Sequence, residues 1–421
     1  MSERFEGEMR EAGGAPARLI AAVSRLWESP AGGEVSARAV AQVAELPVSS
    51  IYYHFGSLEQ LFQAAHRDAV QIAGQWCARR MGEIPDTLDD RAALAPLLAA
   101  AIDGFARECR AASFAWRECQ RAAARDGAYR PMLAQWDALW RSFWQTACTR
   151  CGVPDWSEAT TCFFDGESLF QLMLGDRLVD RACLAETCDG WGQWVQGALA
   201  PEGPWRRHER TRARRTLPPP RTVDGTPDRI AQAAATLVAQ RGAAGLTHRA
   251  VAAEAGVTLG VVSYNFRTSE ELLQGAFDVI YRRAVETHVV EDEPDHWFDD
   301  PARMRDARRH RASDAAMLSL LAMDELLVHV ARRSDSSPFA VQLRYLRGQT
   351  SGPILQTMLG RATSPLDGAV YSSLSLGETR AAIALDADGR EALFARIHDF
   401  LIARLAAPDR KNAPVRRASI G

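Results

Sequence analysis

The chain has 421 residues, of which 47% are hydrophobic and 24% are charged, and its formal net charge is −3. These values are typical of a globular protein of two or three domains and exclude a chain that is disordered throughout. The polar first residues predict no secretory signal, and no run of about 18 apolar residues predicts a transmembrane helix. We therefore expect a cytoplasmic protein without membrane contact, in which any nucleic-acid-binding surface is a local feature.

The N-terminal part of the chain predicts three short helices followed by a longer one. The first is expected over Pro16–Trp27, since proline suits a first helical turn, where its missing N–H needs no partner. Ser36 is a candidate N-cap of the second helix. A tight turn at Glu45–Leu46 leads to a third helix over Pro47–Tyr53, and Ser57 is expected to cap the fourth.

A long helical region follows. Its helical patterns cover residues 92–110, 112–124, 131–151, 158–174 and 181–199. Within the third pattern, Trp136, Trp140 and Trp144 recur every four residues, which places them along one helix face. This stripe predicts a packed core, and the wall of a small-molecule pocket is the alternative.

All eight cysteines lie between Cys77 and Cys188, and Cys148 and Cys151 form a C-x-x-C pair. In a reducing compartment we expect free thiols rather than disulfides. Cys183 and Cys188 form a second pair, but its spacing is unconvincing for a zinc site, and no histidine lies near either pair. We therefore expect neither a metal nor another cofactor, and interpret the cysteines as buried or redox-sensing thiols.

Residues 205–226 have the composition of a linker. Seven arginines but only two acidic residues occur here, and Pro218–Pro220 prevent a continuous helix. We expect a mobile connection. Its arginines either lie on DNA phosphates, which would add salt-dependent affinity, or belong to a solvated tether.

From about residue 227 the chain repeats its N-terminal part at a constant offset of 211 residues, without a gap. Arg38–Ala41 matches Arg249–Ala252, and the aromatic residues of Tyr53–Phe55 match those of Tyr264–Phe266. Chance similarity between two alanine-rich helices would not keep one register through turns and an aromatic pair. The repeat therefore predicts a second head built like the first.

The second copy predicts a helix over 227–240, a turn at Gly256–Val257 and a third helix over Thr258–Tyr264, with Thr247 and Ser269 as N-caps. Helical patterns then cover residues 312–332, 338–359, 368–384 and 390–405. No run alternates with a period of two strongly enough to require a sheet. The sequence therefore predicts an all-α fold in which each head is followed by an antiparallel helical bundle.

The two stretches VSARAVAQVAELPVSSIYYHFGSLEQLF (35–62) and LTHRAVAAEAGVTLGVVSYNFRTSEELL (246–273) resemble the DNA-binding region of TetR-family regulators. The run Tyr52–Phe55 is the most recognisable part. The resemblance implies a helix-turn-helix, whose second helix enters the major groove while the preceding helix crosses the DNA backbone. The recognition helices would be Pro47–Tyr53 and Thr258–Tyr264.

This resemblance implies that both heads contact double-stranded DNA. Phosphate contacts are expected from Ser36, Arg38, Tyr53 and His54 in the first head and from Thr247, Arg249, Tyr264 and Asn265 in the second. Groove-facing residues are expected to be Val48, Ser49 and Tyr52 in the first head and Leu259, Gly260 and Ser263 in the second. Pro47, Ser50, Thr258 and Val261 complete the expected DNA-binding residues.

Neither recognition helix carries Arg, Lys, Asn or Gln in its exposed middle, so bidentate base contacts are scarce. Contacts to thymine methyls, hydroxyl contacts and DNA shape are expected to replace them. Leu58 and Ser269 stand where the family usually has lysine, and Ser263 replaces the first tyrosine of the pair, which weakens phosphate contact. Glu45 in the turn, with the excess of acids over residues 1–66, leaves open that the first head only packs.

These observations predict two tandem TetR-like units in one chain. The expected segments are a disordered N-terminus (1–15), a first helix-turn-helix domain (16–66), a first bundle (67–204), the linker (205–226), a second helix-turn-helix domain (227–277), a second bundle (278–407) and a disordered basic tail (408–421). The bundles are expected to pack through their last two helices as an intramolecular pseudo-dimer, monomeric or further dimerised.

We interpret the chain as a transcription regulator, and its unequal recognition helices predict an imperfect palindrome as the operator. The resemblance implies a repressor that responds to a small-molecule effector, with Trp116, Trp136 and Trp140 as candidate pocket residues. The alternative is a TetR-fold ligand-binding or protein-interaction protein with one or both heads no longer binding DNA. No phosphate-binding glycine loop, nucleophile elbow, zinc-binding histidine pair or kinase signature occurs, so we do not expect an enzyme.

Overall fold

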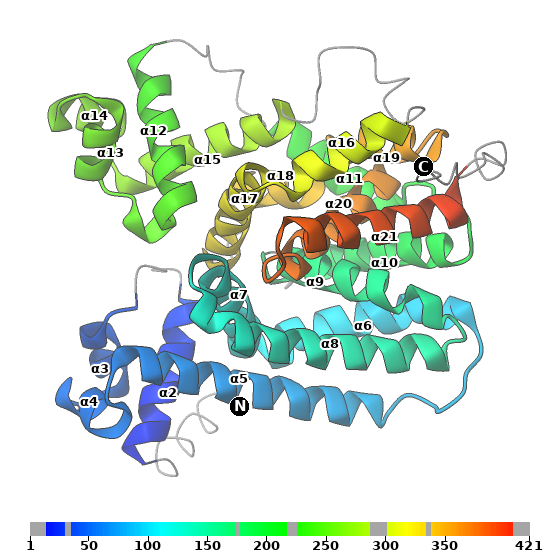
Figure 1. Cartoon of the computed structure of the whole chain (residues 1–421), viewed down its shortest axis with the longest axis horizontal. Coiled ribbons are helices and arrows are strands. Elements are labelled where there is room, and N and C mark those ends of the chain that lie inside the picture. The colour runs from blue at the N-terminus through cyan, green and yellow to red at the C-terminus, as the bar shows by residue number, and fades with distance from the viewer. Residues whose placement is uncertain are drawn as a thin grey trace, which may run out of the picture.

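The computed structural model describes residues 14–29, 35–173, 177–216, 225–286, 301–333 and 338–406. Within these ranges the chain forms helices and no β-strand, as the sequence predicted. The predicted disordered ends lie almost entirely outside the described residues. Among the described helices, none combines the length and the apolar character needed to cross a membrane. Figure 1 shows two small groups of helices, the heads, at the left-hand edge, and a larger body of helices beside them.

The two heads have the same order of helices. The first head consists of α2 (Ala15–Glu28), α3 (Ala37–Ala44) and α4 (Ser49–Phe55), and α5 (Leu58–Met81) carries the chain into the body. The second head consists of α12 (Thr226–Arg241), α13 (His248–Ala255) and α14 (Leu259–Asn265), followed by α15 (Ser269–Glu286). In both heads the first helix buries one apolar face, which in α2 is formed by Leu19, Ala22, Val23 and Trp27.

Side-chain N-caps fix where the helices of the heads begin. Ser36, Ser57 and Thr247 each accept a hydrogen bond from the backbone N–H three residues on, so these three predicted caps are confirmed. The predicted cap at Ser269 is wrong. The hydroxyl of Thr268 takes that role at 3.0 Å, and it is Thr268 that lies at the position equivalent to Ser57.

The first bundle adds five helices to α5. They are α6 (Leu94–Glu108), α7 (Arg110–Arg125), α8 (Arg130–Arg150), α9 (Ser157–Met173) and α10 (Leu178–Val195). All five lie close to the predicted ranges. Trp136, Trp140 and Trp144 of α8 are fully buried, so the tryptophan stripe forms part of the core.

The predicted mobile linker is wrong over its first half. Pro204–Arg215 form helix α11, which packs against α10 and against α18 (Pro338–Tyr345). The remaining residues 217–224 of the predicted linker lie outside the described residues.

Helix α11 forms because its arginines find partners within the protein. Arg206 is buried and donates a hydrogen bond to the hydroxyl of Thr187 at 3.1 Å. Glu209, on the same face, is also buried and accepts from Arg177 at 3.0 Å. Arg206 is therefore not available to DNA phosphates, contrary to one of the two expectations for this segment.

The second bundle follows α15. Its helices are α16 (Pro301–Ala312), α17 (Asp314–Arg333), α18, α19 (Ser351–Leu359), α20 (Pro365–Ala381) and α21 (Ala387–Leu405). The single helix predicted over 338–359 is wrong, because α18 ends at Tyr345 and the turn before α19 contains Gly348, whose φ is +93°. A Cβ at Gly348 would lie 2.4 Å from the carbonyl carbon of Gly368, so the close approach of α20 also requires glycine there.

The two bundles meet along α9 and α20, which pack side by side in the body (Figure 1). A Cβ on Gly166 would lie 1.9 Å from the carbonyl oxygen of Ser373, and a Cβ on Gly377 would lie 1.8 Å from that of Cys162. These two contacts are reciprocal, since Gly377 and Ser373 follow Gly166 and Cys162 by the same 211 residues that relate the heads.

Candidate nucleic-acid interface

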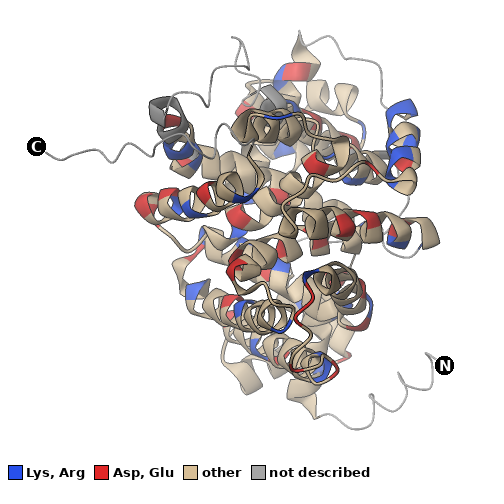
Figure 2. Ribbon diagram, turned by 90° about the vertical axis from the view of Figure 1, so that its right-hand side faces the viewer, with Lys and Arg blue, Asp and Glu red and all other residues tan. Residues whose placement is uncertain are grey.

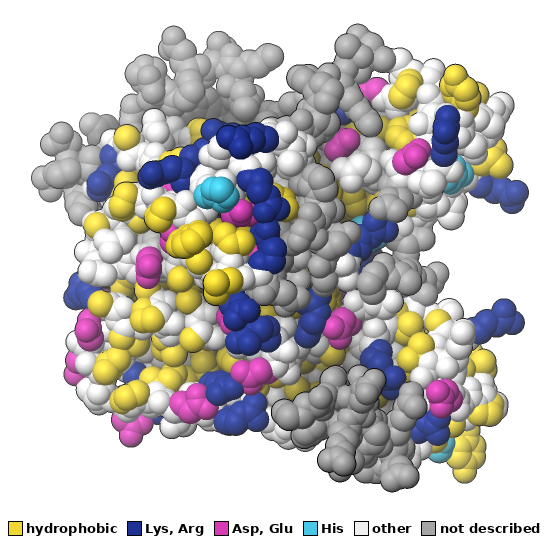
Figure 3. Space-filling model, turned by 180° about the vertical axis from the view of Figure 1, so that it is seen from behind, with side chains coloured by type: hydrophobic (Ala, Val, Ile, Leu, Met, Phe, Trp, Pro, Cys, Tyr) yellow, Lys and Arg dark blue, Asp and Glu magenta, His cyan; other side chains and the backbone are white. Residues whose placement is uncertain are grey.

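Helices α4 and α14, the last helices of the two heads, form the candidate interface. Both lie at the outer edge of their heads, on the same side of the molecule and away from the body (Figure 1). Seen from behind, the heads project as separate lobes with the surface hollowed between them (Figure 3). Each of these helices has one buried residue, Ile51 in α4 and Val262 in α14. The other side chains of both helices are at least partly exposed, so neither helix is covered by a bundle.

The side of the molecule away from the heads is less suited to a duplex. Acidic and basic residues are interspersed there, and neither sign dominates the face (Figure 2). A DNA backbone is bound by clustered positive charge, which this face lacks. The heads are therefore the better candidates for nucleic-acid contact.

The predicted contact residues lie on the outward surface of the heads. The exposed ones are Ser36, Arg38, Pro47, Val48, Ser49, Tyr52, Tyr53 and His54 in the first head, and Thr247, Arg249, Thr258, Leu259, Gly260, Ser263 and Tyr264 in the second. Ser50, Val261 and Asn265 are half-buried. Tyr53 and Tyr264, at equivalent positions, are 84% and 85% exposed, which is unusual for large aromatic side chains that have no partner to contact.

The capping hydroxyls keep the ability to bind a phosphate. Ser36 and Thr247 use an oxygen lone pair to accept from the backbone, at 3.2 and 3.1 Å, which leaves the hydroxyl proton free to donate. Asn265 already donates one amide hydrogen to the carbonyl of Val261 at 2.8 Å, so one amide hydrogen remains for DNA.

Two side chains that sequence analysis missed hold the recognition helices in place. Arg18 of α2 donates to the carbonyl of Ala44 at 2.6 Å and thereby ties α2 to the turn between α3 and α4. In the second head, His248 Nε2 lies 2.9 Å from the carbonyl of Phe266, so that nitrogen must carry the proton. Neither role had a signal in the sequence, because both residues occupy positions typical of solvent-exposed helix faces.

The turn before each recognition helix has the same left-handed backbone. Glu45 has a φ of 53° and Gly256 a φ of 64°, and each is the C-cap residue of the preceding helix. Glycine adopts this conformation without cost, whereas a side chain there costs roughly 1–2 kcal/mol. The first head therefore carries a strain that the second head lacks.

We expect Glu45→Gly to raise the stability of the protein by about 1 kcal/mol, measured as the shift in the midpoint of urea denaturation. The matched control is Gly256→Ala, which should lower stability by a similar amount, because its new Cβ meets no atom within 4 Å and only the backbone opposes it. A loss of stability in Glu45→Gly would mean that the Arg18–Glu45 ion pair, 3.9 Å long, outweighs the strain.

The three tryptophans named as candidate pocket residues pack on one another in the first bundle. The ring centroid of Trp116 lies 5.8 Å from that of Trp136 and 5.3 Å from that of Trp140, and all three side chains are buried. Their indole N–H groups have no hydrogen-bond partner among the described residues. This geometry is that of a packed core. It agrees with the first interpretation of the tryptophans in the sequence analysis and not with the alternative, the wall of a small-molecule pocket.

The eight cysteines are free and buried. Burial raises the pKa of Cys148 to about 12 and also raises the pKa of Cys151. These thiols are therefore protonated near neutral pH, which disfavours a redox-sensing role because the thiolate is the reactive form. Over the residues that the structure describes, no three His, Cys, Asp or Glu side chains gather to hold a metal ion.

The sequence of the second head matches a known family. Residues 230–276 match the model of bacterial regulatory proteins of the tetR family. The match includes α13 and the recognition helix α14, and it supports a DNA-binding transcription regulator. It does not extend to the first head, and the comparison with curated proteins gave no match. The first head nevertheless shares with the second head the helix order, the hydroxyl cap of its second helix and the left-handed turn that follows.

Proposed function

We propose that the protein is a sequence-specific transcription regulator that contacts DNA through both heads. The observation that carries this proposal is the pair of exposed, equivalent tyrosines, Tyr53 and Tyr264, on two helices that face the same side of the molecule. Exposed Arg38 and Arg249, on the helices before them, supply cations for the phosphates on either side of a groove. Contacts of this kind position the recognition helices, whose remaining side chains then read the bases.

The two halves of the chain would act as an intramolecular pseudo-dimer. The contacts of Gly166 with Ser373 and of Gly377 with Cys162 support this. In a two-fold interface each contact occurs twice, with the roles of the two halves exchanged, and these two contacts are related in that way. One chain would then present two helices to half-sites about 34–36 Å apart, one helical turn of DNA.

The operator should be an imperfect palindrome, since the recognition helices differ in sequence. Tyr52 of the first helix corresponds to Ser263 of the second, and both are exposed. Base readout would depend on these hydroxyls and on apolar contacts to thymine methyls. Footprinting is the measurement, and a perfectly symmetric operator bound by two chains would contradict the pseudo-dimer.

We expect Tyr53→Ala and Tyr264→Ala each to weaken DNA binding about tenfold, through loss of a phosphate contact, and the double variant to weaken it about a hundredfold. The measurement is a gel-shift titration at moderate salt with DNA fragments from the region upstream of the gene. Leu178→Ala is the matched control, since Leu178 is 80% exposed but lies on α10, outside the heads.

The outcomes separate the functional alternatives. Loss of binding in only one tyrosine variant would mean that the other head serves packing alone. Absence of a shift with any neighbouring promoter fragment would favour a ligand-binding or protein-interaction protein of the same fold. We also propose that a small-molecule effector changes the separation of the heads and so releases DNA, as in a repressor.

A further inference from the structure

A cavity of about 400 Å³ lies where both heads meet the body. It is lined by the end of α2, by α5 and α7, by the end of α12 with the turn after it, and by α17. A cavity of this size suits a small organic molecule. Its place is notable because a molecule bound there would contact the first head and the second head at once.

One wall of the cavity is aromatic. The rings of Trp27 and His66 are stacked at 4.3 Å, and Phe62 and Tyr129 lie beside them with centroids 6.2 Å from Trp27 and 5.7 Å from His66, respectively. His66 is only 2% exposed, and its Nδ1 has no hydrogen-bond partner among the described residues. Burial lowers the pKa of His66 to about 3, so the ring is neutral near neutral pH. A buried polar atom without a partner is costly, and a bound ligand could supply the missing hydrogen bond.

Arginines also line the cavity, and their charges are compensated to different degrees. Arg332 is buried and bound to Glu118, so its charge is compensated. Arg241 lines the rim of the cavity, is exposed, and makes no ion pair within the described part of the chain. Arg125 has 41% of its side chain exposed and makes one contact to Glu325 at 3.0 Å. Two glutamates, Glu59 and Glu118, line the cavity together with four arginines, so the charge of its lining is positive on balance beside the aromatic surface.

We propose that this cavity binds a small aromatic carboxylate, with its ring against Trp27 and Phe62 and its carboxylate at Arg241 and Arg125. Guanidinium groups bind carboxylates through charge-assisted hydrogen bonds, which supply the affinity that an uncharged analogue lacks. The inference rests on the proposed function, for which this ligand would be the effector.

Contacts around the cavity connect it to both heads. Glu325 of α17 accepts from the backbone N–H of Ala243, directly after α12, at 3.0 Å, and it also binds Arg125 of α7. Arg332 of α17 donates to the carbonyl of Trp27, at the end of α2, at 2.9 Å. Arg125 and the N–H of Ala243 share the carboxylate of Glu325, so a ligand carboxylate that binds Arg125 changes the charge around the group that holds the turn after α12. A ligand that shifts this turn changes the separation of the heads, and ligand and DNA then change each other's affinity by the same factor.

The test is isothermal titration calorimetry of the full chain, without DNA, using benzoate, 2-naphthoate and the uncharged 2-naphthamide. We expect at least one of the two acids to bind with a Kd below about 1 mM, and 2-naphthoate to bind at least about tenfold more tightly than 2-naphthamide. Arg241→Gln should weaken acid binding about tenfold. Arg229→Gln is the matched control, because Arg229 is exposed on the same helix but does not line the cavity.

No binding of either acid, equal binding of acid and amide, or an unchanged Kd in Arg241→Gln would each overturn the proposal. Gel shifts with and without 2-naphthoate keep the two proposals distinguishable. If the acid binds at Arg241 but the protein shifts no DNA, the cavity assignment stands and the regulator proposal fails. If DNA is shifted and the acids do not bind, the reverse holds.

Discussion

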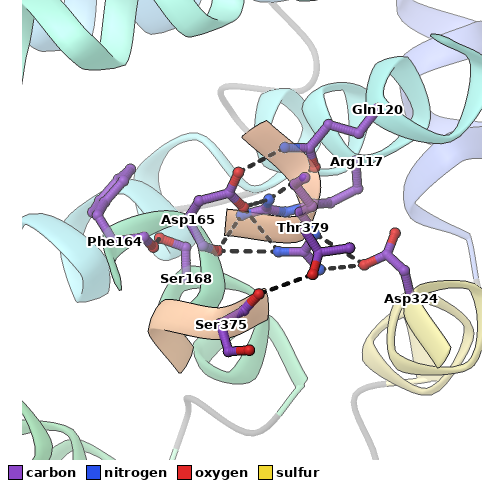
Figure 4. A network of polar contacts seen from close by, with 9 residues as sticks. Arg117, Gln120, Phe164, Asp165, Ser168, Asp324, Ser375 and Thr379 are labelled. Carbon is purple, nitrogen blue, oxygen red and sulfur yellow. Dashed lines mark hydrogen bonds and ion pairs between the residues drawn. The ribbon is translucent and has the colours of Figure 1, made fainter. Parts of the chain in front are cut away.

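Replacing Arg380 by alanine is expected to lower the free energy of unfolding by about 3–5 kcal/mol, because it leaves the buried Asp324 without the arginine that it binds and Asp165 with only one of its two arginines. Arg380 of α20 is buried between Asp165 of α9 and Asp324 of α17, with contacts of 2.8 and 2.9 Å. Arg117 of α7 binds the same oxygen of Asp165 from the other side, and Gln120 binds its second oxygen at 2.7 Å (Figure 4). The network thus joins helices of both bundles, and removing one cation affects all of it.

The measurement is urea denaturation followed by circular dichroism. Arg396→Ala is the matched control, because Arg396 also joins the two bundles, through Glu158, but that pair is about half exposed on both sides. Exposed pairs contribute roughly 0–1 kcal/mol, so this control should change little. Equal losses in Arg380→Ala and Arg396→Ala would show that burial of the network adds nothing.

The sequence predicted the heads in detail because their signals are local. A cap depends on one hydroxyl and the next few residues, which is why Ser36 and Thr247 could be identified from the chain alone. The left-handed turn at Gly256 has a similar local signal, and the equivalent turn at Glu45 was also predicted, although glutamate rarely adopts this conformation. The outward position of Tyr53 and Tyr264 was expected from the resemblance to the TetR family, and both side chains are exposed.

The contacts between the halves had no such signal. Periodicity assigns charged residues such as Asp165 and Arg380 to a solvent-facing side, and only their partners from other helices allow both to be buried. The same applies to Arg206 of α11, where arginine content suggested a mobile linker. The cavity where the heads meet the body depends on five helices coming together, α2, α5, α7, α12 and α17, and no local pattern encodes this. Gly166 and Gly377 are separated by the same 211 residues that relate the two heads. The repeat was recognised only within the heads, so these two glycines were not connected from the sequence alone.

We expect Gly377→Ala to lower the free energy of unfolding by about 3 kcal/mol, at the upper end of the range for overpacking. Its Cβ would lie 1.8 Å from the carbonyl oxygen of Cys162, and that atom belongs to the backbone of α9, so no side-chain rotation can relieve the overlap. The two helices must move apart, which also stretches the Arg380–Asp165 contact. Thermal denaturation followed by circular dichroism measures the loss.

Gly166→Ala should cost as much as Gly377→Ala, since its Cβ would lie 1.9 Å from the carbonyl oxygen of Ser373 in the reciprocal contact. The matched control is Gly74→Ala in α5, where a Cβ meets no atom within 4 Å. That substitution should stabilise the helix by about 0.5–1 kcal/mol, because alanine loses less backbone entropy than glycine on folding. If Gly377→Ala were as mild as Gly74→Ala, α20 would have room to move away from α9, and a pseudo-dimer held together by reciprocal glycines would lose its support.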